Sequence, residues 1–189
     1  MALRFLTDGE TVKSLTFGEL IARAERVARH LQVPGAGGER VLLLLPPGPD
    51  YVVSLLGCLL AGVTCVPAYP PRFNRPMMRL IKIVEDAQAK FALSSDAIVR
   101  NVQRRNNGFP QLACLRWLSI EQIDSGAALP EVKTESSLDA PAIIQYTSGS
   151  TSDPKGVILS NHGLSQHCLE LASSVGTDED DRWLSWLPP

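Results

Sequence analysis

Residues 145–156 read QYTSGSTSDPKG, a span rich in hydroxyl side chains and glycine that carries one lysine. Three apolar residues, 142–144, come directly before it, and three more, 157–159, come directly after it. Short apolar runs on both sides of a polar loop are typical of strands, so the sequence predicts a strand–loop–strand unit. Such a loop offers backbone N–H groups, hydroxyl donors and one positive charge to an anion. We therefore expect a polyphosphate ligand.

This loop differs from a Walker phosphate-binding loop, which needs Gly directly before its Lys and Ser or Thr directly after it. Here Pro154 and Gly156 flank Lys155, and an apolar run rather than a helix start follows. Phosphate binding by a helix N-terminus is therefore not expected. The donors that remain are Thr147, Ser148, Ser150, Thr151 and Lys155. Composition alone also leaves open a surface hairpin with no ligand.

The composition is that of an ordinary globular protein. The chain has 189 residues, 44% of them hydrophobic and 20% charged, which suffices for one substantial core. A net charge of −2 gives no indication of a nucleic-acid or anionic-membrane partner. No apolar run is long enough to span a bilayer, and the N-terminus lacks a signal-peptide pattern. We expect a cytoplasmic protein whose Cys58, Cys65, Cys114 and Cys168 are reduced core residues.

Strands and helices are expected to alternate along the chain. Five aliphatic residues in a row, 41–45, indicate a strand buried on both faces, which is typical of a parallel sheet covered by helices. Further strands are expected at 63–67, 91–93, 112–118, 142–146, 156–160 and 183–187. The fold class is therefore α/β, a mainly parallel sheet flanked by helices with right-handed crossovers.

The helices have clear end signals. Thr16 and Glu19 form the pattern of a capping box, and apolar residues then recur at helical spacing. These residues are Leu20, Ala24, Val27, Ala28 and Leu31. Other helices are expected at 50–61 with Gly62 as C-cap, at 75–87 with Asn74 as N-cap, at 96–105, and to about 174 with Asn161 as N-cap. Residues 126–140 are expected to be an irregular surface connection.

Three other polar features of the sequence are candidate sites. His162 and His167 are five residues apart with no thiol or carboxylate to complete a zinc set, so no metal site is expected. The acidic run 178–181 is interpreted as a solvated turn. Arg72, which follows Pro70 and Pro71, is a candidate contact for a phosphopantetheine arm or a carrier protein.

The span YTSGSTSDPKG, residues 146–156, resembles the phosphate-binding signature of the adenylate-forming superfamily, which includes acyl-CoA synthetases and peptide-synthetase adenylation domains. Two further elements agree in order and spacing. Residues 15–20 read LTFGEL, and residues 60–62 read LAG ahead of Val66 and Pro67. The resemblance covers essentially the whole chain and implies the N-terminal subdomain of an adenylate-forming enzyme.

Within that superfamily the chain looks most like the fatty acyl-AMP ligases. The similarity rests on VPAYPPR at 66–72, on Gln145, and on WLPP at 186–189. Ser152 stands where many members of the superfamily have Gly, and the fatty acyl-AMP ligases vary at that position. The resemblance implies ATP-dependent activation of a fatty acid to acyl-AMP for transfer to an acyl carrier protein in polyketide, lipopeptide or lipid biosynthesis. A fatty acid–CoA ligase and a non-catalytic nucleotide-binding module are the alternatives.

The resemblance also implies roles for single residues. The β- and γ-phosphates of ATP would be bound by Thr147, Ser148, Gly149, Ser150, Thr151, Lys155 and Gly156. Lys155 would be the catalytic residue, because it supplies positive charge. The cofactors implied are ATP and Mg²⁺, with the Mg²⁺ ligands expected outside this chain.

The resemblance further implies that residues 1–189 are a partial N-terminal adenylation domain, truncated before a His-containing substrate segment. We expect such a chain to form no acyl-AMP by itself. A sheet cut near Trp186 would expose an edge or an apolar face, so we also expect some self-association.

Overall fold

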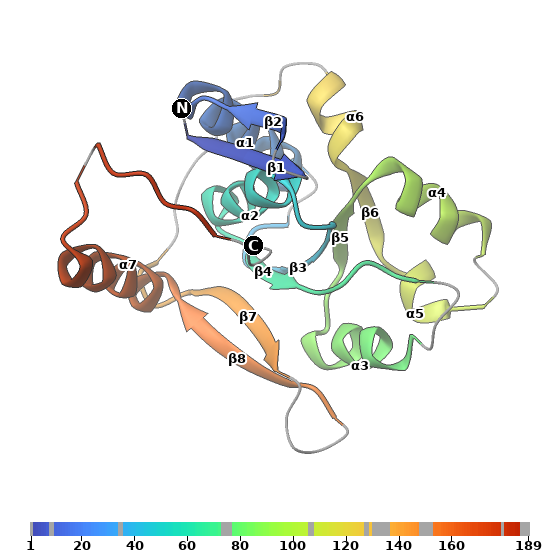
Figure 1. Ribbon diagram of the computed structural model, residues 1–189. Helices are drawn as coiled ribbons and strands as arrows, with labels where there is room; N and C mark the ends of the chain where they lie inside the picture. The colour runs from blue at the N-terminus through green and yellow to red at the C-terminus, as the bar shows by residue number, and fades with distance from the viewer. Residues whose placement is uncertain are drawn as a thin grey trace.

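The computed structural model describes residues 2–7, 10–33, 36–72, 77–105, 108–126, 129, 137–147, 153–178 and 180–185. Its described part contains a six-stranded sheet and a separate two-stranded one (Figure 1). The larger sheet runs, in spatial order, β6 (Arg116–Ser119), β5 (Phe91–Ser94), β3 (Arg40–Leu44), β4 (Thr64–Pro67), β7 (Pro141–Thr147) and β8 (Lys155–Ser160). The smaller sheet pairs β1 (Leu3–Thr7) with β2 (Glu10–Leu15) antiparallel. Neighbours from β6 to β7 are parallel and only β7–β8 is antiparallel, which confirms the predicted fold class.

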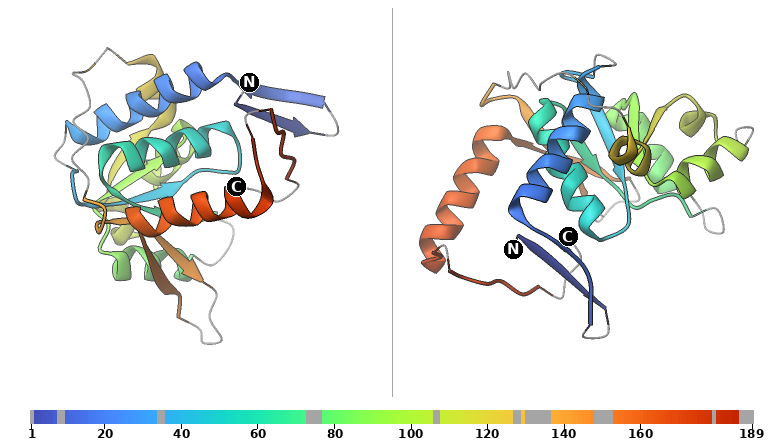
Figure 2. Two further views of the ribbon diagram at one scale, coloured as in Figure 1. Left: turned by 90° about the vertical axis from the view of Figure 1, so that its left-hand side faces the viewer. Right: turned by 90° about the horizontal axis from the view of Figure 1, so that it is seen from above.

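The central strand β3 is covered on both faces, as its aliphatic run predicted. Val41 and Leu43 belong to one apolar cluster with helices α1 (Phe17–Gln32) and α2 (Pro49–Ala61). Leu42 and Leu44 belong to a second cluster with α3 (Met78–Ala87). Alternate residues of a strand point to opposite faces, so one uninterrupted run fills both cores. Figure 2 shows α1 and α2 next to each other on one side of the sheet.

The N-terminus of α1 is fixed by the predicted capping box. The backbone N–H of Thr16 donates to Glu19 Oε2 at 2.8 Å, and the N–H of Glu19 donates to Thr16 Oγ1 at 3.2 Å. The bond from the Thr16 backbone, with a second one from its hydroxyl, lowers the pKa of Glu19. The five predicted apolar residues of α1 are all buried. At the end of α2, Gly62 adopts a φ of 68°, as expected of a C-cap.

An ion-pair network joins α1 to its neighbours. Arg23 donates to Asp50 at the start of α2, at 2.9 Å, and to both carboxylate oxygens of Asp124 in α6 (Ile120–Ser125). Burial opposes the charge on Arg23, but the two carboxylates outweigh it and raise the pKa of the guanidinium. The helices on this face are therefore held by buried apolar contacts and by one shared cation.

Four predictions about where helices and strands begin, or whether they form, were wrong. Residues 112–118 are not one strand, because Pro110 begins a short helix, α5 (Pro110–Ala113), and the strand starts at Arg116. The helix expected at 75–87 begins at Met78, and Asn74 lies outside the described residues. Helix α7 (Asn161–Val175) is capped by Ser160, whose Oγ accepts from the N–H of Gly163 at 3.1 Å. Trp183 and the two residues after it form no strand.

One helix of this region was predicted and another was not. Helix α4 (Asp96–Arg104) lies where a helix was expected, whereas α6 was not foreseen. Helix α6 forms because Ser119 caps it and because Ile120 and Ile123, one turn apart, are both buried.

The cysteine prediction holds for Cys58 and Cys65 alone, since Cys114 and Cys168 are exposed. None of the helices in the described part of the chain is long and apolar enough to cross a bilayer.

A close approach of α1 and α2 gives the first prediction. A Cβ atom on Gly57 of α2 would lie 2.5 Å from the Cβ of Val27 in α1. We expect Gly57→Ala to lower the free energy of unfolding by about 1–3 kcal/mol, because the helices must move apart. Gly18→Ala is the matched control, since a Cβ there meets nothing within 4 Å. Urea unfolding followed by circular dichroism measures both; equal stability of the two variants would contradict the packing argument.

Candidate functional site

The β7–β8 hairpin confirms the predicted strand–loop–strand unit and sets the position of the candidate site. Its register ends with Thr147 opposite Lys155, so these two residues form the mouth of the loop. Residues 148–152 lie outside the described residues, and the predictions for Ser148, Gly149, Ser150 and Thr151 therefore stay predictions. A strand and not a helix follows the loop, which separates it from a Walker loop as the sequence indicated.

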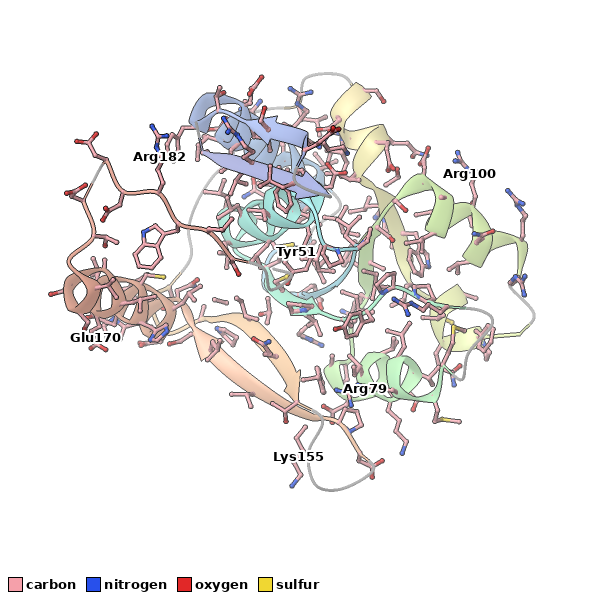
Figure 3. The ribbon with its side chains drawn as sticks, viewed as in Figure 1. Tyr51, Arg79, Arg100, Lys155, Glu170 and Arg182 are labelled. Atoms are coloured by element: carbon pink, nitrogen blue, oxygen red, sulfur yellow. The ribbon has the colours of Figure 1, made fainter. Side chains whose placement is uncertain are left out.

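Lys155 and Thr147 are both exposed at this mouth. Figure 3 shows the Lys155 side chain at the tip of the hairpin, pointing away from the sheet. Among the described residues Lys155 forms no ion pair, in contrast to Lys82 and Lys90. An ammonium group and a hydroxyl thus face solvent side by side, an arrangement that suits an incoming anion.

Gly156 has a packing role in the hairpin. It lies opposite Tyr146 in the register. A Cβ atom there would lie 2.8 Å from Ile144 Cγ2 and 3.2 Å from Tyr146 Cζ. Any larger residue would force the Ile144 methyl to move and would crowd the Tyr146 ring, which explains a glycine at this point independently of the predicted phosphate contact.

Tyr146 connects the hairpin to helix α3. Its hydroxyl donates a hydrogen bond of 2.5 Å to Asp86 Oδ2, and the two residues are 60 positions apart in the sequence. Burial of the ring, followed by the bond and charge of Asp86, raises the pKa of Tyr146 well above its ordinary value. The phenol therefore remains a neutral donor at pH values where an ordinary tyrosine would already ionise.

The other arm of the hairpin is attached to the same helix. Lys82 forms an ion pair with Asp153, which stands two residues before Lys155. Lys82 and Asp86 are four residues apart and so share one face of α3. Sequence reasoning missed both contacts. The sequence did contain one signal, because Lys82 and Asp86 form an i,i+4 polar pair on the side of the helix away from Leu80 and Ile83. Their partners lie about 60 to 70 residues further along the chain, however, and no local pattern identifies such partners.

A hollow of about 210 Å³ opens beside the hairpin at the carboxyl ends of β3 and β4. It is lined by Leu45, Pro47, Tyr51, Pro67, Ala68, Tyr69, Arg79, Ile83, Gln145 and Tyr146. The chain leaves β3 toward α2 on one face and leaves β4 toward α3 on the other, so the hollow lies at a topological switch point, where open α/β sheets bind ligands. Figure 3 labels Tyr51 and Arg79, which approach it from α2 and α3.

The remaining candidate residues lie away from the hairpin mouth. Arg72 is exposed and lines a neighbouring hollow of about 500 Å³ together with Pro70 and Pro71. His162 and His167 are exposed on α7. Within the described ranges no three His, Cys, Asp or Glu side chains gather as a metal site.

Asp178, Asp180 and Asp181 of the acidic run bond to one another as in a turn, and Glu179 lies outside the described residues. The N–H of Asp178 donates to the Asp181 carboxylate at 3.0 Å, and the N–H of Asp180 donates to the Asp178 carboxylate at 2.9 Å. Backbone N–H groups of the same segment therefore already donate hydrogen bonds to these two carboxylates.

Comparison with known proteins agrees with this geometry. The family profile described as AMP-binding enzyme matches residues 2–189. The medium-chain fatty acid–acyl-carrier-protein ligase JamA of Moorena producens is 35% identical over 192 residues, covering 99% of this chain and 32% of that protein. The long-chain-fatty-acid–AMP ligase FadD23 of Mycobacterium tuberculosis is 31% identical over 182 residues, covering 93% of this chain and 31% of that protein.

A solved structure of a fatty acyl-adenylate ligase is also similar to this chain. The fatty acyl-adenylate ligase from L. pneumophila, crystallised with acyl adenylate and pyrophosphate, matches with a TM-score of 0.79 and 30% identity. The match covers 98% of this chain and 32% of that one. The resemblance to fatty acyl-AMP ligases is thereby confirmed, and the chain spans about a third of the length of the relatives it matches.

The contact between Tyr146 and Asp86 gives a prediction about pH. The pKa of Tyr146 is raised in the folded chain, so its hydrogen bond to Asp86 stabilises the fold fully below the pKa of an unfolded tyrosine, about 10. Above that pH this contribution to the free energy of unfolding decreases, and it is lost as the pH passes the raised pKa. Asp86→Asn removes the charge and is expected to lower the pKa of Tyr146. Phenolate absorbance of the protein and of Tyr146→Phe isolates this residue among the three tyrosines. An unchanged Tyr146 titration in Asp86→Asn would contradict the assignment.

Proposed function

Because this chain belongs to the AMP-binding enzyme family, we propose that its β7–β8 hairpin binds the polyphosphate of ATP in an enzyme that activates fatty acids as acyl-adenylates. The observation that carries this proposal is the hairpin mouth, where Thr147 and the exposed Lys155 lie opposite each other. The names of the relatives, a fatty acid–AMP ligase and a fatty acid–acyl-carrier-protein ligase, support the choice of a fatty acid as the activated acid.

In the proposed reaction the fatty acid carboxylate attacks the α-phosphorus of ATP. The bond from that phosphorus to the bridging oxygen breaks, acyl-AMP forms, and pyrophosphate leaves with the electron pair. Negative charge grows on the leaving pyrophosphate, so a fixed cation and hydroxyl donors at its oxygens lower the barrier. Lys155 supplies this cation and Thr147 one hydroxyl. Ser148, Gly149, Ser150, Thr151 and Gly156 are proposed to complete the phosphate contacts.

Mg²⁺ is proposed as the second cofactor, and it would neutralise phosphate charge. The described residues offer no cluster of carboxylates or imidazoles to hold it. The resemblance implies that its protein ligands come from outside this chain, and the hydroxyl and ammonium donors of the hairpin suit the nucleotide phosphates rather than a metal ion.

An acyl carrier protein is proposed as the acceptor of the acyl group, in polyketide, lipopeptide or lipid biosynthesis. Support comes from the relative whose name states that acceptor. Coenzyme A is the alternative acceptor. Purified protein supplied with ATP, fatty acid and either holo-carrier protein or coenzyme A distinguishes them by the acylated product. We place this chemistry in the cytoplasm, where ATP and both acceptors occur.

The role of Lys155 gives a binding prediction. Lys155→Ala is expected to weaken ATP binding at least about 10-fold, because a charge-assisted contact contributes roughly 1.5–3 kcal/mol. Isothermal titration measures the Kd. Lys90→Ala is the matched control, since Lys90 is an exposed lysine that pairs with Glu39 at 2.6 Å, away from the hairpin. Equal ATP affinity of Lys155→Ala and the unsubstituted chain would contradict the proposal. It would favour a surface hairpin with no ligand, or a non-catalytic module.

Activation of the acid is proposed to need more than residues 1–189 contain, since the relatives that share this part are about three times as long. We expect this chain alone to catalyse no ATP–pyrophosphate exchange with lauric acid above background. Exchange of radiolabelled pyrophosphate into ATP measures it, with a complete fatty acyl-AMP ligase as the positive control. Clear fatty-acid-dependent exchange by the chain alone would overturn this proposal.

A further inference from the structure

We propose that Lys82 and Asp86 of α3 are positioning residues, which hold Tyr146 and Asp153 so that the carboxylate of Asp153 stays away from the anion at Lys155. This inference rests on the proposed function, because it gives the hairpin a polyphosphate ligand.

The two residues form an outer face of α3 that is separate from its core face. Leu80, Ile83 and Val84 of α3 are buried against the sheet. Lys82 and Asp86 are one helical turn apart, and both direct their side chains to the hairpin. Since the core contacts fix α3 to the sheet, the polar face presents its two charges at a defined place.

The two contacts bracket Lys155. Asp86 binds the Tyr146 hydroxyl, and the Tyr146 ring lies over Gly156, the residue directly after Lys155. Lys82 binds Asp153, two residues before Lys155. The backbone of Lys155 is therefore fixed from both sides by one rigid helix.

The contact to Asp153 also has an electrostatic consequence. Asp153 is the one acid in residues 145–156, and it stands beside the one lysine. An unpaired carboxylate here would attract Lys155 and repel a polyphosphate. Lys82 neutralises the carboxylate, so Lys155 keeps its charge available for a ligand.

The pair can be removed without unfolding the chain. The Asp153 side chain is 73% exposed and that of Lys82 is 38% exposed. Exposed ion pairs contribute little to folding, so Lys82→Gln should leave the melting temperature within about a degree or two of the parent value. A change in anion affinity in this variant then reports on the site and not on the fold.

The test is a double-mutant cycle on the 189-residue chain, with pyrophosphate as the titrant in isothermal titration at low salt. Lys82→Gln is expected to weaken pyrophosphate binding about 5-fold, because it frees the Asp153 carboxylate. Asp153→Asn is expected to bind at least as tightly as the parent chain. The double variant should bind like the parent chain, because it removes both charges of the neutralised pair and leaves the local net charge unchanged. A purely structural contact would instead make Lys82→Gln and Asp153→Asn equally weak.

The second contact is tested by a conservative rescue. Asp86→Ala and Tyr146→Phe each break the hydrogen bond, and each is expected to weaken pyrophosphate binding about 3-fold, with no further loss when combined. Asp86→Asn keeps an acceptor for the Tyr146 hydroxyl and should bind like the parent chain. Arg100→Gln is the control for Lys82→Gln, because it removes an exposed cation of an i,i+4 pair on α4, remote from Lys155 (Figure 3), and it should bind like the parent chain.

The outcomes separate the two proposals. If Lys155→Ala loses binding while Lys82→Gln and Asp86→Ala bind like the parent chain, the positioning role is wrong and the proposed function stands. If Lys82→Gln and Asp153→Asn are equally weakened, the electrostatic part is wrong. If the parent chain binds no pyrophosphate, both the proposed function and this inference fail.

Discussion

The burial of β3 on both faces is the constraint on which the rest of the structure depends. A strand with no access to water must have its backbone groups bonded on both edges, and β3 has β4 on one side and β5 on the other. Both of its faces also need apolar cover, so consecutive crossovers must pass on opposite sides of the sheet. Because the chain leaves β3 and β4 on opposite faces of the sheet, a hollow opens at the carboxyl ends of these two strands, and the hairpin lies beside it.

Helix α3 connects this core to the candidate site. Its apolar residues complete one face of the sheet, and its polar residues reach the hairpin. The same helix therefore serves stability through Ile83 and ligand geometry through Lys82 and Asp86. A rigid support of this kind suits phosphate binding, where contacts help only when they are already in place before the charge develops.

Local sequence signals predicted much of the fold and part of the site. The apolar run of β3, the capping box at Thr16 and the C-cap at Gly62 act over a few residues, and all were confirmed. Helix α6 was missed because six residues carry too little periodicity to be recognised. The hairpin was predicted from its apolar flanks, and its register places Thr147 opposite Lys155, so that each strand reaches one residue further toward the loop than the sequence indicated. Its attachment to α3 joins residues far apart in sequence, so only the folded chain reveals it.

The way β7 joins the sheet has a consequence for the order in which the protein opens. Strand β4 pairs with β3 over four residues but with β7 at Cys65 and Ile143 alone, aided by the bond from Thr64 Oγ1 to Pro141 O at 3.0 Å. The helix that follows the hairpin, α7, buries none of its residues. Amide protons of β8 and α7 should therefore exchange with solvent through local opening, well before those of β3. The candidate ligand site lies on this sparsely attached part of the fold, and an anion that binds to the folded chain there would stabilise it against local opening.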